Sequence, residues 1–227
     1  MQYILGIDSG LTVTKAAIFD SNGQLIAISR RRLPQLLPEP HQVERDMHTF
    51  WLQTVEVIRE VISLSGCSPS EISVVSATAH GDGIYLLDEQ NAPLGPGILS
   101  LDTRAKSIVN EWHEQGLNAD AINLSGQRPH ASAPSALLNW IKRFQPERYK
   151  KIGTVLSAKD WLRYCLSGSL GTDITEASTS FTNVGTQRYD SDILKLYGLE
   201  SLRSALPEIA SSSQVVGAVT AQAAEQT

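Results

Sequence analysis

The chain has 227 residues, 41% of them hydrophobic and 19% charged, which is typical of a folded protein with one large core or two small ones. Its net charge of -5 and pI near 5.5 argue against a general nucleic-acid or anionic-membrane surface, because such partners attract clustered Lys and Arg. No apolar stretch approaches the roughly 20 residues of a membrane helix, and the amino-terminal apolar run is too short for a signal peptide.

The two cysteines, Cys67 and Cys165, lie far apart and form neither a CxxC motif nor a spacing typical of metal ligands. We therefore expect reduced thiols in a cytoplasmic protein and no thiolate-bound metal. The one basic run, Arg30 to Arg32, is short, and we interpret it as a solvated strand end rather than a phosphate patch.

Three strands are expected at the start of the chain, at about 2–8, 12–20 and 24–32. They are rich in β-branched and apolar residues and are joined by an SG turn and by the SNG turn at Ser21–Gly23. Turns this short connect neighbouring strands that run in opposite directions. The chain therefore opens with an antiparallel three-stranded unit.

A helix is expected next, at about 47–64, with Asp46 placed to cap it. The apolar run at 72–80 predicts a short buried strand that ends in HGDG. A hairpin-like pair follows at 84–88 and 96–99.

Helices dominate the rest of the chain, at about 103–115, 134–144 and 157–167. After about residue 210 we expect a short strand and the start of a helix of small residues, a pattern that indicates either a fragment or a naturally short protein. Strands followed by alternation with helices are typical of the α/β class, here a mixed sheet covered by helices.

A candidate ligand site lies where the first strand turns into the second. Asp8 ends the first strand, Gly10 allows a tight turn, Thr12 offers a hydroxyl, and Lys15 offers a cation. Backbone N–H groups of such a turn can hold phosphate oxygens, and a carboxylate suits Mg²⁺, usually through water. The turn therefore predicts a Mg-nucleotide phosphate site, although it lacks a P-loop motif. The alternative is that Asp8 only caps the turn and Lys15 is a solvated strand residue.

Several segments resemble the FGGY family of carbohydrate kinases. DSGLTVTKAAIFD resembles the family's first phosphate-binding hairpin, DxGTTSxKAxxFD, and PHQVERDMHTFW is similar to its PGWVEHDPxxxW segment. The stretch 72–105 resembles the sugar-binding strand and the hairpin after it, SAPSALLNWIKRF the first family signature, and KDWLRYCLSGSLGTDITEASTSF the DYLxxxLTG and TDxSxAS stretches. The five segments occur in the family's order over essentially the whole chain. SATAHGDG and ILSLDTRA are most similar to members that phosphorylate L-xylulose.

This resemblance implies an actin-like ATPase (ribonuclease H-like) fold and an enzyme that transfers phosphate from ATP, with Mg²⁺, to a sugar or polyol hydroxyl. A pentulose such as L-xylulose is the favoured substrate. Residues 1–227 would form the first of two domains, with the C-terminal domain absent from this chain. That absence would leave an apolar face exposed and gives a reason for a homodimer.

The resemblance also implies roles for single residues. Asp8 would lie near Mg²⁺ and phosphate, and Thr12 and Lys15 near the transferred phosphate. The sugar pocket would be lined by His80, Asp82, Asp102 and Arg104.

These roles have structural alternatives. His80 could be a hydrogen-bonded histidine at a strand end, and Asp102 with Arg104 could be a salt bridge that caps the following helix. The four tryptophans are expected in the core rather than at the sugar.

This sequence departs from the family pattern at informative positions. Leu11 replaces a Thr near the phosphates, and Ser100 stands where many members carry Trp beside the substrate, which indicates a different or roomier sugar site. Gly81 and Asp82 replace the Arg-Glu of glycerol kinases, which argues against glycerol as the substrate.

The family's catalytic base lies in a GxxD-like turn that would follow Thr227, and no residue of this chain matches it. We therefore expect the chain to be inactive alone and to bind nucleotide weakly. The main alternative is a non-catalytic actin-like module that senses nucleotide or sugar. An acetate-kinase-like transferase is disfavoured because HGDG and LDTR suit hydroxyl recognition.

Overall fold

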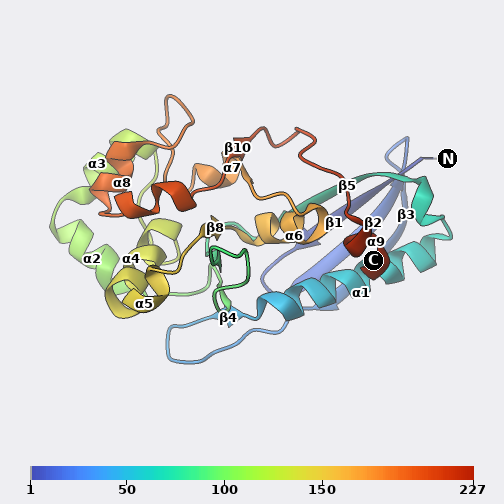
Figure 1. Ribbon diagram of the computed structural model, residues 1–227, viewed down its shortest axis with the longest axis horizontal. Coiled ribbons are helices and arrows are strands. Elements are labelled where there is room, and N and C mark those ends of the chain that lie inside the picture. Colours follow the sequence, from blue (N-terminus) through green and yellow to red (C-terminus); the bar gives the residue numbers. More distant parts are fainter. Residues whose placement is uncertain (1) are drawn as a thin grey trace.

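The computed structural model describes residues 2–227, which form two parts that lie next to one another along the longest axis (Figure 1). The part that contains the main sheet is called the sheet half, and the part that contains most of the short helices is called the helical half. The sheet half consists of β1 (Tyr3–Ser9), β2 (Val13–Asp20), β3 (Leu25–Arg32), β5 (Ile72–Ala79), α1 (Met47–Ser65), α6 (Ala158–Ser167) and α9 (Ala221–Gln226). The helical half consists of α2 (Lys106–Glu114), α3 (Leu117–Ser125), α4 (Pro134–Phe144), α5 (Pro146–Tyr149) and α8 (Ser191–Leu196).

The main sheet has the strand order β3-β2-β1-β5. β2 is antiparallel to both of its neighbours, whereas β5 runs parallel to β1. The predicted antiparallel start and mixed sheet are therefore confirmed, with strand ends within one residue of the expected ones. The boundaries were readable because alternating apolar residues must keep one side of each strand in the core.

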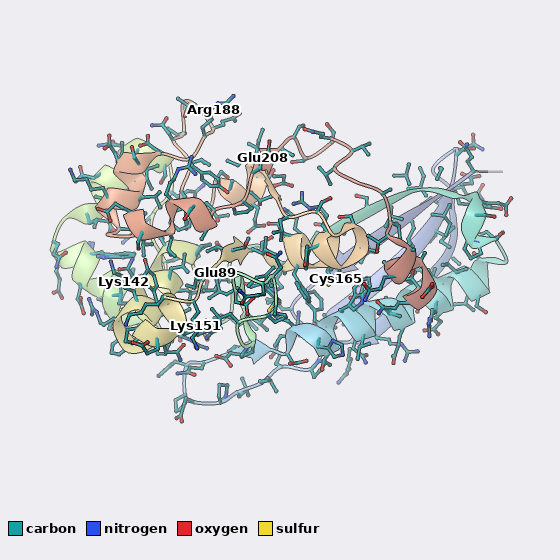
Figure 2. The ribbon with its side chains drawn as sticks, in the orientation of Figure 1. Glu89, Lys142, Lys151, Cys165, Arg188 and Glu208 are labelled. Carbon is teal, nitrogen blue, oxygen red and sulfur yellow. The ribbon has the colours of Figure 1, made fainter. Side chains whose placement is uncertain are left out.

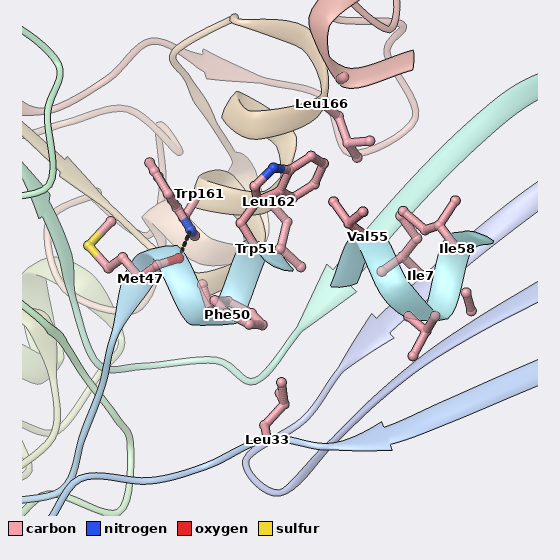
Figure 3. Close-up of a cluster of buried hydrophobic side chains, with 14 of the residues drawn as sticks. Ile7, Leu33, Met47, Phe50, Trp51, Val55, Ile58, Trp161, Leu162 and Leu166 are labelled. Carbon is pink, nitrogen blue, oxygen red and sulfur yellow. Dashed lines mark hydrogen bonds between the residues drawn. The ribbon is translucent and has the colours of Figure 1, made fainter. Parts of the chain in front are cut away.

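Helix α1 covers one face of this sheet, mainly over β2 and β3. It begins as predicted, with the side chain of Asp46 accepting a hydrogen bond from the Thr49 N–H, and it ends at Gly66, whose φ of 68° is left-handed. Figure 3 shows the buried cluster between α1, α6 and the strands, in which the indole of Trp161 donates to the carbonyl of Met47 at 3.0 Å. This bond joins α6 to the start of α1.

The opposite face of the sheet is exposed. Ile4, Ile28 and Val74 are 37%, 51% and 52% exposed, and the strand register places Ile4 beside Val74 and Ala17 beside Ile28. We call these four residues the open face. An apolar sheet face of this kind is normally covered by a further element or a partner.

Short strands join the two halves. They are β4 (Glu44–Arg45), which pairs with β7 (Gly97–Ile98), and β6 (Tyr85–Leu87), which pairs with β8 (Thr154–Leu156). The hairpin-like pairing predicted between 84–88 and 96–99 does not form a continuous ladder. Only an isolated bridge between Ile84 and Ile98 is present, because both segments pair elsewhere.

The strand β6 contributes to both hydrophobic cores. Tyr85 and Leu87 lie in the core of the sheet half, whereas Leu86, which points the other way, lies in the core of the helical half. Successive side chains of a strand point to opposite faces, so one buried strand can serve two cores. The two halves are therefore packed against a shared element.

The remaining elements are two 3₁₀ helices at Pro69–Glu71 and Glu200–Ala205, and the group of β9 (Thr172–Asp173), α7 (Ile174–Ala177) and β10 (Ile209–Ala210). The strand predicted after residue 210 is wrong, since residues 211–220 contain none, but the small-residue helix is confirmed as α9. α3 was not predicted; it follows directly after α2, separated by Gly116 at a φ of 77°.

Polar side chains cap α7 and α6, and both cysteines are unpaired. Asp173 caps α7, and Ser157 caps α6, where Asp160 occupies the third helical position of a capping box. Both cysteines are free thiols, Cys67 buried and Cys165 on α6 (Figure 2). No helix within residues 2–227 is long and apolar enough to cross a membrane.

Candidate functional site

The turn between β1 and β2 carries an exposed ion pair. Asp8 and Lys15 face one another in the strand register, and the Lys15 ammonium lies 3.0 Å from the Asp8 carboxylate, with the two side chains 50% and 46% exposed. The turn is closed by the Gly10 N–H, which donates to the Val13 carbonyl at 2.9 Å. Thr12 lies exposed at its tip. We call residues 8–15 the phosphate turn; its acid lies at the surface and outside the hydrophobic layer.

Sequence reasoning did not identify all residues around this turn. Register places Thr78 beside Asp8 and Arg30 beside Lys15, so that these four side chains form one row across the sheet on the side of the open face. Counting across the turn at 21–23 would have paired Lys15 with Ser29, because it misses the register shift between Ile18 and Phe19 that brings Arg30 opposite Lys15. Two cations side by side repel one another, which makes the row suited to an anion.

The residues of the phosphate turn fit a nucleotide-bound Mg²⁺ better than a metal cage. Within residues 2–227, no three His, Cys, Asp or Glu side chains gather as a metal site. Mg²⁺ typically uses one or two carboxylates together with phosphate oxygens and water. Asp8 could supply that carboxylate, and Lys15 could bind a phosphate oxygen.

His80 lies directly beside the phosphate turn, because its backbone N–H donates to the Ser9 carbonyl at 3.0 Å. Its Nδ1 lies 3.3 Å from the Gly81 carbonyl and its Nε2 lies 3.3 Å from the Tyr85 hydroxyl. A carbonyl only accepts, so Nδ1 carries the proton and Nε2 accepts. Burial, reinforced by the charge of Arg45, lowers the pKa of His80 to about 4. The ring is neutral at pH 7, and both contacts are long enough for a sugar hydroxyl to compete.

Asp82 lies two residues further on, in a left-handed conformation with φ of 56°. Its carboxylate is 3.5 Å from the Nε2 of His130, and this contact raises the pKa of His130. Sequence reasoning missed His130, which precedes α4 and has no distinguishing motif. The two side chains are 29% and 49% exposed, so this pair is open to a ligand.

Asp102 and Arg104 occupy a different environment. Their side chains are 0% and 2% exposed, and they form an ion pair of 2.7 Å. Arg104 also contacts Glu44 at 2.8 Å and lies over the Trp140 ring at 5.0 Å, while Asp102 accepts from the Val43 N–H. The salt bridge of the structural alternative is present, but it does not cap the following helix, whose N-cap residue is Ala105 and which has no side-chain cap. A role as sugar ligands stays a prediction.

A narrow cavity of about 40 Å³ lies behind the Asp82 loop and is lined by Gly83, Asp160, Glu176, Thr179 and Tyr189, among others. Glu176 follows the start of α7, and its Oε1 is buried without a hydrogen-bond partner among residues 2–227. Burial raises the pKa of Glu176 to about 7. No local pattern in the sequence predicts the burial of Glu176, because it depends on elements distant in the chain.

Comparison with known proteins matches the chain to carbohydrate kinases. A family model described as the FGGY family of carbohydrate kinases, N-terminal domain, matches residues 3–227. The chain is 39% identical to a probable L-xylulose kinase from Pasteurella multocida, over all of this chain and 47% of that protein. It is 37% identical to the L-xylulose/3-keto-L-gulonate kinase of Escherichia coli, over all of this chain and 46% of that protein.

The structure also superposes on xylulose kinase from Rhodospirillum rubrum with a TM-score of 0.91 and 25% identity, covering 100% of this chain and 46% of that one. The chain thus spans about half the length of the curated relatives that it matches. The resemblance in the sequence and the expected actin-like ATPase fold are both confirmed. This chain belongs to the FGGY family of carbohydrate kinases, whose N-terminal domain it matches over nearly its whole length.

Proposed function

We propose that the protein containing this chain transfers the terminal phosphate of ATP to a hydroxyl of a pentulose, with L-xylulose as the favoured substrate. The observation that carries the proposal is the adjacency of two unlike sites. An exposed Asp8–Lys15 pair suits phosphate and Mg²⁺, and the neighbouring His80 is neutral and suits a hydroxyl. Relatives named for L-xylulose support the choice of sugar.

Each residue has a defined task in this proposal. Lys15 and the backbone N–H groups of the turn would hold phosphate oxygens, while Asp8 would orient the hydrated Mg²⁺. Magnesium would neutralise charge on the phosphates during transfer. His80 and Asp82, joined by His130, would fix the sugar so that its hydroxyl lies in line with the phosphate. Asp102 and Arg104 would support the pocket wall from behind.

A second part of the protein is needed for the complete reaction. No residue of this chain occupies the position of the family's base, and we propose that a further domain supplies it together with the adenosine pocket. The relatives' length and the open face support this, since Ile4, Ile28 and Val74 require a cover. Such a kinase would work with ATP in the cytoplasm.

The test is a coupled assay of ADP release by the full-length gene product with L-xylulose, D-xylulose, L-ribulose, erythritol and glycerol. We expect turnover with a pentulose and little with glycerol. Lys15→Met should lower kcat/KM by at least about tenfold, because the phosphate loses a charged contact. Lys151→Met is the matched control, since Lys151 is an exposed lysine of the helical half (Figure 2).

Two results would change the proposal. Nucleotide binding without turnover on any sugar would favour the sensing module. Robust sugar-dependent ATP turnover by the 227-residue chain alone would show that the base lies within it and would remove the need for a second domain.

A further inference from the structure

The short strand β4 carries a buried arginine beside the phosphate turn. Arg45, its second residue, is only 1% exposed and is among the largest fully buried side chains. Its guanidinium donates to the carbonyls of Gly10 and Leu11, which form the tip of the phosphate turn. The guanidinium also lies over the Phe50 ring at 5.0 Å. The side chain therefore supports the phosphate turn from inside the protein.

The same guanidinium reaches His80 through one intermediate. The charge of Arg45 acts on Tyr85, a residue that is 0% exposed, and opposes the rise that burial causes in the pKa of its hydroxyl. That hydroxyl then faces His80 Nε2 at 3.3 Å. Because Nε2 of His80 is the accepting nitrogen, the Tyr85 hydroxyl donates its hydrogen bond to it. Arg45 and Tyr85 thus lie between the phosphate turn and His80.

The position of β4 is itself fixed from the other side. The preceding residue, Glu44, contacts Arg104 at 2.8 Å, and the Val43 N–H donates to Asp102 at 2.7 Å. Adjacent residues of a strand point to opposite sides, so Glu44 faces the buried ion pair while Arg45 faces the turn. The ion pair therefore holds the strand that carries Arg45.

The partners of Arg45 leave its charge uncompensated. Within residues 2–227 it forms no ion pair, and its Nε is buried without a partner. Burying an arginine without a carboxylate is costly, so a fold that needed only packing would be better served by an apolar side chain. A positive charge behind a turn that holds phosphates is, by contrast, useful when an anion is bound.

We propose that Arg45 is a positioning residue that holds the phosphate turn and His80 in one fixed arrangement and adds positive charge behind the turn. The functional part of this inference rests on the proposed kinase reaction. The structural part, a link from Gly10 and Leu11 through Arg45 and Tyr85 to His80, stands independently of it.

The kinetic test uses the full-length gene product. Arg45→Met should lower kcat/KM by about a hundredfold, the effect of misplacing reacting groups by about 1 Å. Arg45→Lys keeps the charge and should recover part of this loss. Arg148→Met is the matched control, because Arg148 is a partly buried arginine that likewise donates to loop carbonyls, those of Leu94 and Pro96.

The structural test uses NMR of the 227-residue chain and needs no catalysis. Arg45→Met should shift the amide signals of Leu11 and Thr12 and raise the pKa of His80. Tyr85→Phe removes only a hydroxyl, so the fold should survive, and it should shift His80 while leaving the turn amides in place.

The outcomes separate the two ideas. If the unaltered protein phosphorylates no sugar but both NMR responses occur, the kinase proposal fails and the structural link stands. The positioning role is wrong if Arg148→Met lowers kcat/KM as much as Arg45→Met. It is also wrong if neither Arg45→Met nor Tyr85→Phe changes the NMR signals or the pKa of His80.

Discussion

Two acid–base pairs, both expected from the sequence to contact ligands, occupy opposite environments in this protein. Asp8 and Lys15 are about half exposed at a turn, whereas Asp102 and Arg104 are completely enclosed and joined to Glu44. Water and salt weaken the first pair, so it can exchange its internal contact for a phosphate at little cost. The second pair is isolated from water, and breaking it leaves an unpaired buried charge. Burial thus separates a ligand site from the framework that supports it.

The largest expected effect tests the buried pair. Asp102→Asn should lower the free energy of unfolding by about 3 to 5 kcal/mol, because Arg104 keeps a buried charge that has lost a partner. Urea denaturation monitored by tryptophan fluorescence measures it. Glu111→Gln is the control, since it breaks the exposed Glu111–Arg143 pair and should cost less than about 1 kcal/mol. Equal losses for the two variants would contradict the comparison.

Glu176 sharpens the comparison because the Oε1 atom of its carboxyl is buried without a hydrogen-bond partner among residues 2–227. Its pKa is raised from 4.5 to about 7, so the folded state binds this proton more tightly than the unfolded chain does. The stability that this binding gives to the folded state is fully present below pH 4.5 and is lost as the pH rises through 7. Glu176→Gln removes this loss. The free energy of unfolding of the variant, relative to that of the unaltered chain, should be about 3 kcal/mol higher at pH 8 than at pH 4.5.

Thermal or urea unfolding at the two pH values measures the Glu176 effect. Glu208→Gln is the control, because Glu208 is an exposed glutamate near the same region (Figure 2). An advantage that does not change with pH would mean that Glu176 is already ionised at low pH.

His80 should produce an effect of similar size and opposite direction. Its pKa is lowered from 6.5 to about 4, so the unfolded chain takes up a proton before the folded protein does. Stability should fall by up to about 3 kcal/mol between pH 7 and pH 4 from this residue. His80→Gln should reduce that dependence, whereas His113→Gln, at an exposed position, should preserve it.

The smallest effect concerns the exposed pair. Lys15→Met should change the free energy of unfolding by less than about 1 kcal/mol, because the pair is solvated. The same variant should clearly weaken the protection that MgADP gives against thermal unfolding of the full-length gene product. A large loss of stability with unchanged nucleotide protection would assign Lys15 to the framework instead.

The sequence was most informative where structure depends on near neighbours. The β1–β3 meander, the Asp46 cap and the positions of Asp8 and Lys15 were readable, because alternation and short turns fix strand register within about 30 residues. Resemblance in five ordered segments also identified the family, since such order reflects one shared fold.

Tertiary structure decided which polar residues face water. Asp8 and Asp102 each follow an apolar segment and lie near a basic residue, yet one lies at the surface and the other in the interior. Arg45 and Glu176 carried no local signal, because their environments are built by elements far away in the chain. The sequence by itself determined the strands, the first helix and the family. Only the folded chain decided the burial of its charges, since burial is set by long-range packing that no local pattern contains.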